Sequence, residues 1–148
     1  MTIELLRKAR ELVWSKMPEE IRSILSKRGL LLPAGIILYA ESDTRNFHEI
    51  LWEIYNRVSK GKVKGSELKF MLLTLLDYYE RKMSGWYHLN EIASVLANAR
   101  KIIENATTLE EYIEVVRELM LYIGRISMWL DLLIPWYEIN EVIKKMRI

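Results

Sequence analysis

The chain has 148 residues, of which 51% are hydrophobic and 28% are charged. This length suits one domain, and the apolar fraction is sufficient for a packed core rather than a disordered chain. The 22 basic and 20 acidic residues nearly cancel, and the complete absence of cysteine excludes disulfides, thiolate metal sites and cysteine nucleophiles.

Apolar residues recur at spacings of three and four along the first half of the chain, which predicts amphipathic helices. The wholly apolar run of residues 30–40 is interpreted as a buried helix that begins near Pro33. Residues 42–44 (Ser-Asp-Thr) are typical of a turn and a helix cap, so a new helix is expected after them. The helices expected in this half cover residues 5–17, 18–28, 33–40 and 47–58.

The second half continues the helical spacing. Residues 61–65 (Gly-Lys-Val-Lys-Gly) are the clearest predicted loop, and Ser66 is expected to cap the helix after it. Residues 84–85 (Ser-Gly) are expected to end that helix, residues 108–111 have the form of a capping box, and Pro135 is expected to end or interrupt the last long helix. The sequence therefore predicts one all-α domain over residues 1–148, a compact bundle of about seven or eight helices.

Histidine chemistry is sparse, since His48 and His88 are the only two histidines. They are too far apart for a zinc-protease helix, and no phosphate-binding glycine loop is present in the sequence. His48 has Glu49 and Glu53 within about one helical turn, but it is interpreted as a surface residue; an acid–base enzyme built on it is a third hypothesis. We expect no catalytic residues, no metal and no cofactor.

Charge is distributed unevenly. Residues 57–69 hold five basic residues against one glutamate, whereas residues 103–118 hold five glutamates against one arginine. Mobile ammonium groups can bind a nucleic-acid backbone without reading its bases, although basic clusters at helix ends also favour the helix dipole and solubility. The candidate nucleic-acid-binding residues are Lys60, Lys62, Lys64, Lys69, Lys27 and Arg28.

Three aromatic residues, Trp14, Trp52 and Tyr55, stand off the main apolar stripes of their helices. Large aromatic side chains outside a core are enriched at protein interfaces. These three are therefore the candidate interface residues, with packing in the core as the alternative.

Two stretches carry a resemblance to a known family. The stretch that starts at Ser23 (Ser-Ile-Leu-Ser-Lys-Arg-Gly-Leu-Leu) and continues through residues 36–41 resembles the small helical subunit of the type III-B (Cmr) CRISPR effector complex. Near the C-terminus, Tyr112, Glu118 and Trp129-Leu130 follow the order found in that family's late helix. The resemblance implies a non-catalytic subunit of antiviral defence that stacks with its own copies along a guide RNA–target duplex and contacts phosphates through basic residues.

Two functional hypotheses follow. The first is a structural, RNA-contacting subunit of a ribonucleoprotein, and the second is a helical protein–protein module or regulator without nucleic acid. The expected partners are other protein subunits or further copies of the chain, with guide RNA or an RNA duplex under the first hypothesis only.

The expected location is the cytoplasm, without a membrane partner. The polar start is unlike a signal peptide, and the longest apolar run, residues 30–40, is too short to cross a bilayer. The lack of Gln and Cys is typical of proteins that function at high temperature, so a thermophilic source is also expected.

Overall fold

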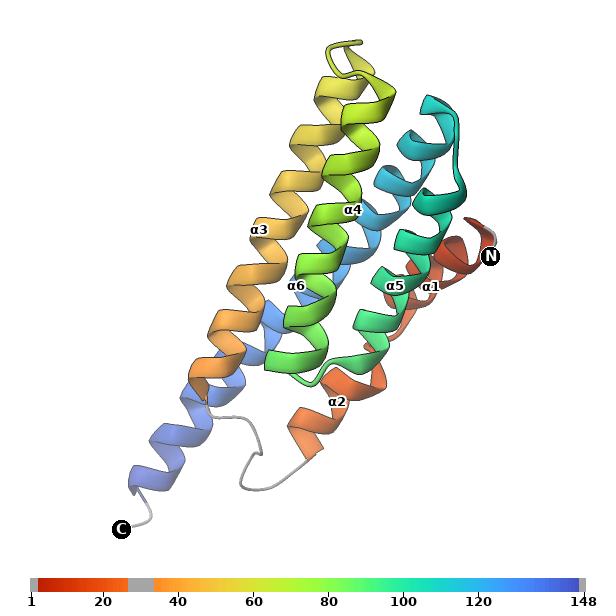
Figure 1. Cartoon of the computed structure of the whole chain (residues 1–148). Helices are drawn as coiled ribbons and strands as arrows, with labels where there is room; N and C mark the ends of the chain where they lie inside the picture. The colour runs from red at the N-terminus through yellow and green to blue at the C-terminus, as the bar shows by residue number, and fades with distance from the viewer. Residues whose placement is uncertain (1–2, 27–33, 147–148) are drawn as a thin grey trace.

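The computed structural model describes residues 3–26 and 34–146, and every regular element within these ranges is a helix (Figure 1). This confirms the predicted all-α bundle. The elements in chain order are α1 (Ile3–Ser15), α2 (Glu19–Ser26), α3 (Ala34–Ser59), α4 (Gly65–Arg81), the π-helical turn η1 (Lys82–Trp86), α5 (Asn90–Asn105) and α6 (Leu109–Met146).

The predicted number of helices is wrong, because two expected breaks lie inside continuous helices. The expected turn at residues 42–44 is within α3, where the Thr44 hydroxyl donates to the carbonyls of Ala40 and Glu41, at 2.9 Å each. The hydroxyl is thus satisfied inside the helix and caps no new one. Pro135 lies within the 38-residue α6, so the helix continues through the residue that was expected to end or interrupt it.

The connections between α3, α4 and α5 follow the sequence only in part. The predicted loop is confirmed, since α3 ends at Ser59 and α4 begins at Gly65. Ser66 is not the expected cap, because Lys64 takes the N-cap position of α4. Ser-Gly at residues 84–85 does not end the helical path, which continues as η1 to Trp86.

The predicted cap by Thr108 at the start of α6 is confirmed. The Glu111 amide donates to Thr108 Oγ1 at 3.2 Å, and the Thr108 hydroxyl donates to Glu111 Oε1 at 2.8 Å. The Thr108 side chain thereby satisfies one of the otherwise unpaired N–H groups of the first turn.

Helix α6 is the central element of the bundle. Helices α1 and α3 pack most extensively against it, whereas α4 and α5 pair mainly with each other (Figure 1). One stripe of α6 is almost completely buried, and it comprises Val115, Val116, Leu119, Ile123, Ile126, Leu130 and Leu133. None of the helices in the ranges that the structure describes is long and apolar enough to span a membrane.

Side chains from neighbouring elements satisfy several helix ends. The two Glu20 carboxylate oxygens accept the backbone amides of Glu91 and Ile92, at 2.9 Å each, at the start of α5. Arg125 and Trp129 both donate to the Val13 carbonyl at the end of α1, at 3.3 and 2.8 Å. Because these groups would otherwise lack an intrahelical partner, the contacts fix the shorter helices on the bundle.

Candidate functional site

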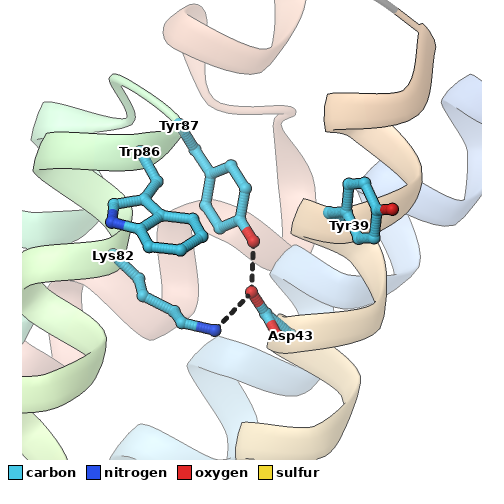
Figure 2. Close-up of a pocket in the computed structure, with 5 residues that line it drawn as sticks. All are labelled: Tyr39, Asp43, Lys82, Trp86 and Tyr87. Atoms are coloured by element: carbon cyan, nitrogen blue, oxygen red, sulfur yellow. Dashed lines mark hydrogen bonds and ion pairs between the residues drawn. The ribbon is translucent and has the colours of Figure 1, made fainter.

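A pocket of about 340 Å³ lies between the first turns of α3 and the turn η1 (Figure 2). Tyr39 and Asp43 of α3 line one side, and Lys82, Trp86 and Tyr87 line the other. The volume falls at the small end of the range of small-molecule sites, which is roughly 300–1,000 Å³. The pocket therefore suits a compact organic molecule rather than a macromolecule.

The pocket exists because α3 and α4 are held by different partners. Helix α3 packs on α6 and α4 packs on α5, so large rings fill the space between α3 and α4. Phe47 stacks on Tyr79 with ring centroids 4.1 Å apart and an interplanar angle of 5°. About one helical turn from this ring pair, toward the start of α3, the facing residues are Asp43 and Lys82 instead of two rings. The space between the two helices stays open there.

The π-helical turn places the aromatic side of the pocket. The Tyr87 amide donates to the Lys82 carbonyl at 3.2 Å, five residues back. Such wide turns rotate the following side chains away from their α-helical positions and are common at functional sites. Here the turn leaves Trp86 at the mouth of the pocket and brings the Tyr87 hydroxyl inward to Asp43 (Figure 2).

The floor of the pocket is a hydrogen-bonded ion pair. Lys82 Nζ lies 3.1 Å from Asp43 Oδ2, and the Tyr87 hydroxyl donates to the same oxygen (Figure 2). Hydrogen bonds to Tyr78 and Asp43 raise the pKa of Lys82 above its ordinary value. Burial, and then the hydrogen bond to Asp43, raise the pKa of Tyr87 well above its ordinary value. Both groups therefore keep their protons at neutral pH.

The walls are exposed aromatic rings. Tyr39 and Trp86 are each 69% exposed and lie on opposite sides of the pocket (Figure 2). Lys82 Nζ is 5.4 Å from the centroid of the Trp86 ring and 5.0 Å from that of Tyr78, so a cation already lies against these aromatic faces. A flat ligand that enters from solvent would meet two rings at the mouth and a polar pair below.

The predicted nucleic-acid-binding lysines fall into two groups. Lys60, Lys62 and Lys64 are exposed on the α3–α4 connection, and none has an ion pair with another described residue. Lys69 instead donates to the Glu104 and Ala106 carbonyls, at 3.0 and 3.3 Å, and so caps the end of α5. Lys27 and Arg28, the remaining candidates, lie outside the described residues. RNA binding through these side chains stays a prediction.

The predicted interface aromatics lie on two helices. Trp52 and Tyr55 stack on one another along α3, with centroids 6.5 Å apart, and Trp14 on α1 lies under the Arg125 guanidinium at 5.1 Å. Trp14 and Trp52 are about half exposed, and Tyr55 packs partly on the core. Their role as a protein interface stays a prediction, and none of them lines the pocket.

Sequence reasoning missed the pocket residues. Trp86 and Tyr87 were given no functional role from the sequence, although they follow Lys82 and the Ser-Gly pair of residues 84–85. The signal that the sequence offered for a pocket was a lysine followed, after a glycine, by two adjacent aromatic residues. Asp43 gave no signal, because it was assigned to a turn that the structure does not contain.

Among the described residues, the histidines and carboxylates do not gather into a second site. His48, expected at the surface, is half-buried, and its ring lies against Gly124 of α6. Within the part of the chain that the structure describes, no three histidine, aspartate or glutamate side chains come together in a way that could hold a metal ion.

Fold and pocket together define an all-α bundle domain with an aromatic-walled surface pocket over a polar floor. A family model for the cucumopine synthase C-terminal helical bundle domain matches residues 1–132, and the chain belongs to this family. No curated protein and no solved structure matches it.

The resemblance to the small subunit of the type III-B CRISPR complex is therefore wrong. Of the residues that carried it near the C-terminus, Tyr112, Glu118 and Leu130 are buried on α6, and Trp129 caps α1. These are packing roles, and apolar helical patterns of this kind recur in unrelated bundles.

Proposed function

We propose that this chain is a binding domain for a small, flat organic molecule, which it holds in the pocket between α3 and η1. The observation that carries the proposal is the juxtaposition of the largely buried Asp43–Lys82 pair with the exposed rings of Trp86 and Tyr39. Mostly apolar walls with a few convergent polar groups are the usual composition of a small-molecule site.

The groups in the pocket support binding rather than reaction. An amine acts as a nucleophile or base only when it is unprotonated, and the raised pKa of Lys82 keeps it charged. The Tyr87 hydroxyl is likewise held as a phenol that donates to Asp43. The family description names a synthase, and a domain of such an enzyme that holds a small molecule is consistent with that name.

The charges on the floor define the class of ligand. Asp43 and Lys82 present opposite charges 3.1 Å apart. A ligand with one net charge is attracted to one of them and repelled by the other, whereas a neutral or zwitterionic molecule avoids this conflict. We therefore propose a flat ligand that is neutral or carries both charges.

Four probes that share one ring and differ in charge test this proposal. They are indole (neutral), L-tryptophan (zwitterionic), indole-3-acetate (anionic) and tryptamine (cationic). Titrations into the full chain are followed through the indole N–H resonance of Trp86, assigned with Trp86→Phe. We expect the neutral and zwitterionic probes to shift this resonance and to bind at least threefold more tightly than the two singly charged probes.

Replacing a wall residue should weaken this binding. Trp86→Ala deletes a stacking surface worth about 0.5–1.5 kcal/mol, so the expected loss of affinity is about two- to tenfold, followed through backbone amide resonances around Asp43. Phe70→Ala is the matched control, because Phe70 is an equally exposed aromatic of α4 that does not line the pocket. Equal effects of both variants, or no binding of any probe at millimolar concentration, would contradict the proposal.

A further inference from the structure

The connection between α3 and α4 carries three lysines at one end of the bundle (Figure 1). Lys60, Lys62 and Lys64 are all exposed, and none is within ion-pair distance of a carboxylate among the described residues. About 24 Å of α3, at 1.5 Å per residue, separates this connection from Asp43 in the pocket. We call these three residues the lysine tip, and it is a surface separate from the pocket.

The end of α3 fixes where the lysine tip begins. Gly61 has a positive φ of 71°, and its amide donates to the Val58 carbonyl at 3.0 Å. The Lys62 amide donates to the Arg57 carbonyl at 3.1 Å, five residues back. These two hydrogen bonds close the helix in the manner of a Schellman motif. The backbone of the tip is therefore held by α3, while its lysine side chains are exposed to solvent.

The fold uses the acidic and the basic stretch of the chain differently. Four of the five glutamates in residues 103–118 are engaged inside the bundle, and they are Glu104, Glu111, Glu114 and Glu118. In residues 57–69, by contrast, Arg57 pairs with Glu53 and Lys69 caps α5, which leaves the three lysines of the tip. The acidic stretch of a second copy is thus largely engaged already, so the tip's charge calls for a different anionic partner.

Lys64 occupies a position where lysine does not help the fold. It is the N-cap residue of α4 and makes no side-chain cap hydrogen bond, because an ammonium group has no acceptor for the amides of the first turn. Its charge also lies at the positive end of the helix dipole, where carboxylates are preferred. Lys60 follows the end of α3, where a cation favours the dipole, but Lys64 has no such benefit. Residues that break a local rule in this way are typical of functional positions.

The composition of the tip indicates the kind of partner. Protein interfaces depend on large buried anchors, but the one apolar residue of the connection, Val63, packs against the core of its own bundle. Single-stranded nucleic acid binds largely by stacking its bases on aromatic side chains, and residues 60–64 contain none. A duplex requires only mobile cations along its phosphates, which are more closely spaced than those of a single strand. The tip therefore fits the backbone of a duplex best.

We propose that the lysine tip binds the phosphate backbone of double-stranded nucleic acid without reading its sequence. Each lysine neutralises one phosphate and releases condensed counterions, so binding weakens as salt increases. Three such contacts give a slope of about 2–3 for log Kd against log salt concentration.

Fluorescence anisotropy of a labelled DNA duplex and a labelled RNA duplex, titrated with the full chain at several salt concentrations, tests the proposal. We expect both duplexes to bind with this slope, and K60Q/K62Q/K64Q should weaken binding at least tenfold. The matched control is K8Q/K16Q/K145Q, which removes the same charge from exposed lysines of α1 and α6 and should weaken binding less than threefold. Absence of duplex binding at low salt, or equal weakening by the two variants, would overturn the proposal.

Two competitors test the class of partner. Poly-L-glutamate presents carboxylates in place of phosphates, and a single strand of the same sequence presents phosphates at lower density. We expect both to displace the labelled duplex less effectively than the unlabelled duplex at equal concentration of charge. Equal or better displacement by either would overturn the proposal, because the tip would then fit an acidic protein or a single strand.

Lys64→Ser separates binding from folding. Serine is a favourable N-cap residue, so this variant should raise the urea midpoint of unfolding while it weakens duplex binding. An unchanged or lower midpoint would show that Lys64 serves the fold of α4, and this would overturn its assignment to a ligand.

Discussion

At Gly124, helix α6 carries no side chain where α3 brings the imidazole ring of His48 against it. A Cβ atom at this position would lie 2.8 Å from His48 Cδ2 and 2.9 Å from Nε2, closer than real contacts allow. Glycine is therefore required at this position because the His48 ring approaches so closely, and not because of the backbone conformation. It permits α3 and α6 to form the largest helix pair in the bundle.

Gly124→Ala should lower the free energy of unfolding of the wild-type protein. In a background that lacks the His48 ring, the same substitution should raise it. In the wild type, the forced displacement of His48 is expected to cost about 1–3 kcal/mol, more than the gain of about 1 kcal/mol in helix propensity. In the His48→Ala background, the same change should stabilise by up to about 1 kcal/mol. Urea unfolding of the four proteins measures both values, and the same sign in both backgrounds would disprove the contact.

His48 should also make stability depend on pH. Burial lowers its pKa below the ordinary 6.5, and the charge of Glu49 offsets part of this effect. The unfolded chain therefore takes up a proton at higher pH than the folded protein does, so the free energy of unfolding should fall as pH decreases below about 6.5.

The measurement is the free energy of unfolding at several values between about pH 7 and pH 5.5. We expect a smaller fall in His48→Asn than in the wild type. His88→Asn is the control, since His88 is exposed and its φ of 55° is a conformation that asparagine also adopts. If the free energy of unfolding falls equally with pH in the wild type and in His48→Asn, His48 is not the cause of the pH dependence.

Among the elements, α1 is attached to α6 by charge as well as by apolar packing. Glu118 of α6 is 1% exposed, and its carboxylate lies 2.8 Å from Arg10 Nε and 3.7 Å from Arg7 Nε. Arg7 also reaches Glu114 at 2.9 Å. A buried carboxylate that depends on arginines of another helix fixes the position of that helix along α6.

Glu118→Gln should loosen α1 more than Glu114→Gln. The first change removes a buried charge from the guanidinium groups of Arg7, Arg10 and Arg117, which remain partly hydrated, so a loss of about 2 kcal/mol is expected. The second removes a half-exposed partner and should cost less than about 1 kcal/mol. Hydrogen exchange of the α1 amides, with unfolding free energies, measures the difference; equal losses would show that burial of Glu118 is unimportant.

Most helices could be predicted from the sequence, because an apolar spacing of three and four marks each buried stripe. Helix ends were less predictable where packing outweighed local preference. Thr44 has the residue type of a cap, but it is buried with its hydroxyl bonded inside α3. Pro135 has the residue type of a terminator, yet α6 continues through it. In α3 the continuous helix keeps Ala40 and Phe47, on either side of Thr44, in the core.

At the scale of the whole molecule, the pocket is a product of how helices are partnered. Asp43 and Lys82 are far apart in sequence and belong to helices that pack mainly on other neighbours. No local pattern encodes their approach, so the sequence could suggest Trp86 at most. By contrast, the exposed lysines of the α3–α4 connection could be located from the sequence, because loop position and charge are both local properties.

The central position of α6 has a consequence for how the chain acquires its structure. During synthesis, α1 and α3 leave the ribosome well before the helix against which they pack, whereas α4 and α5 are neighbours in sequence and can pair early. Closing the core requires contacts between the first and the last helices, which slows folding compared with a bundle of sequential hairpins. Until α6 emerges, the apolar stripes of α1 and α3 lack the helix that covers most of them, and this nascent intermediate is the state most exposed to aggregation and to chaperone binding.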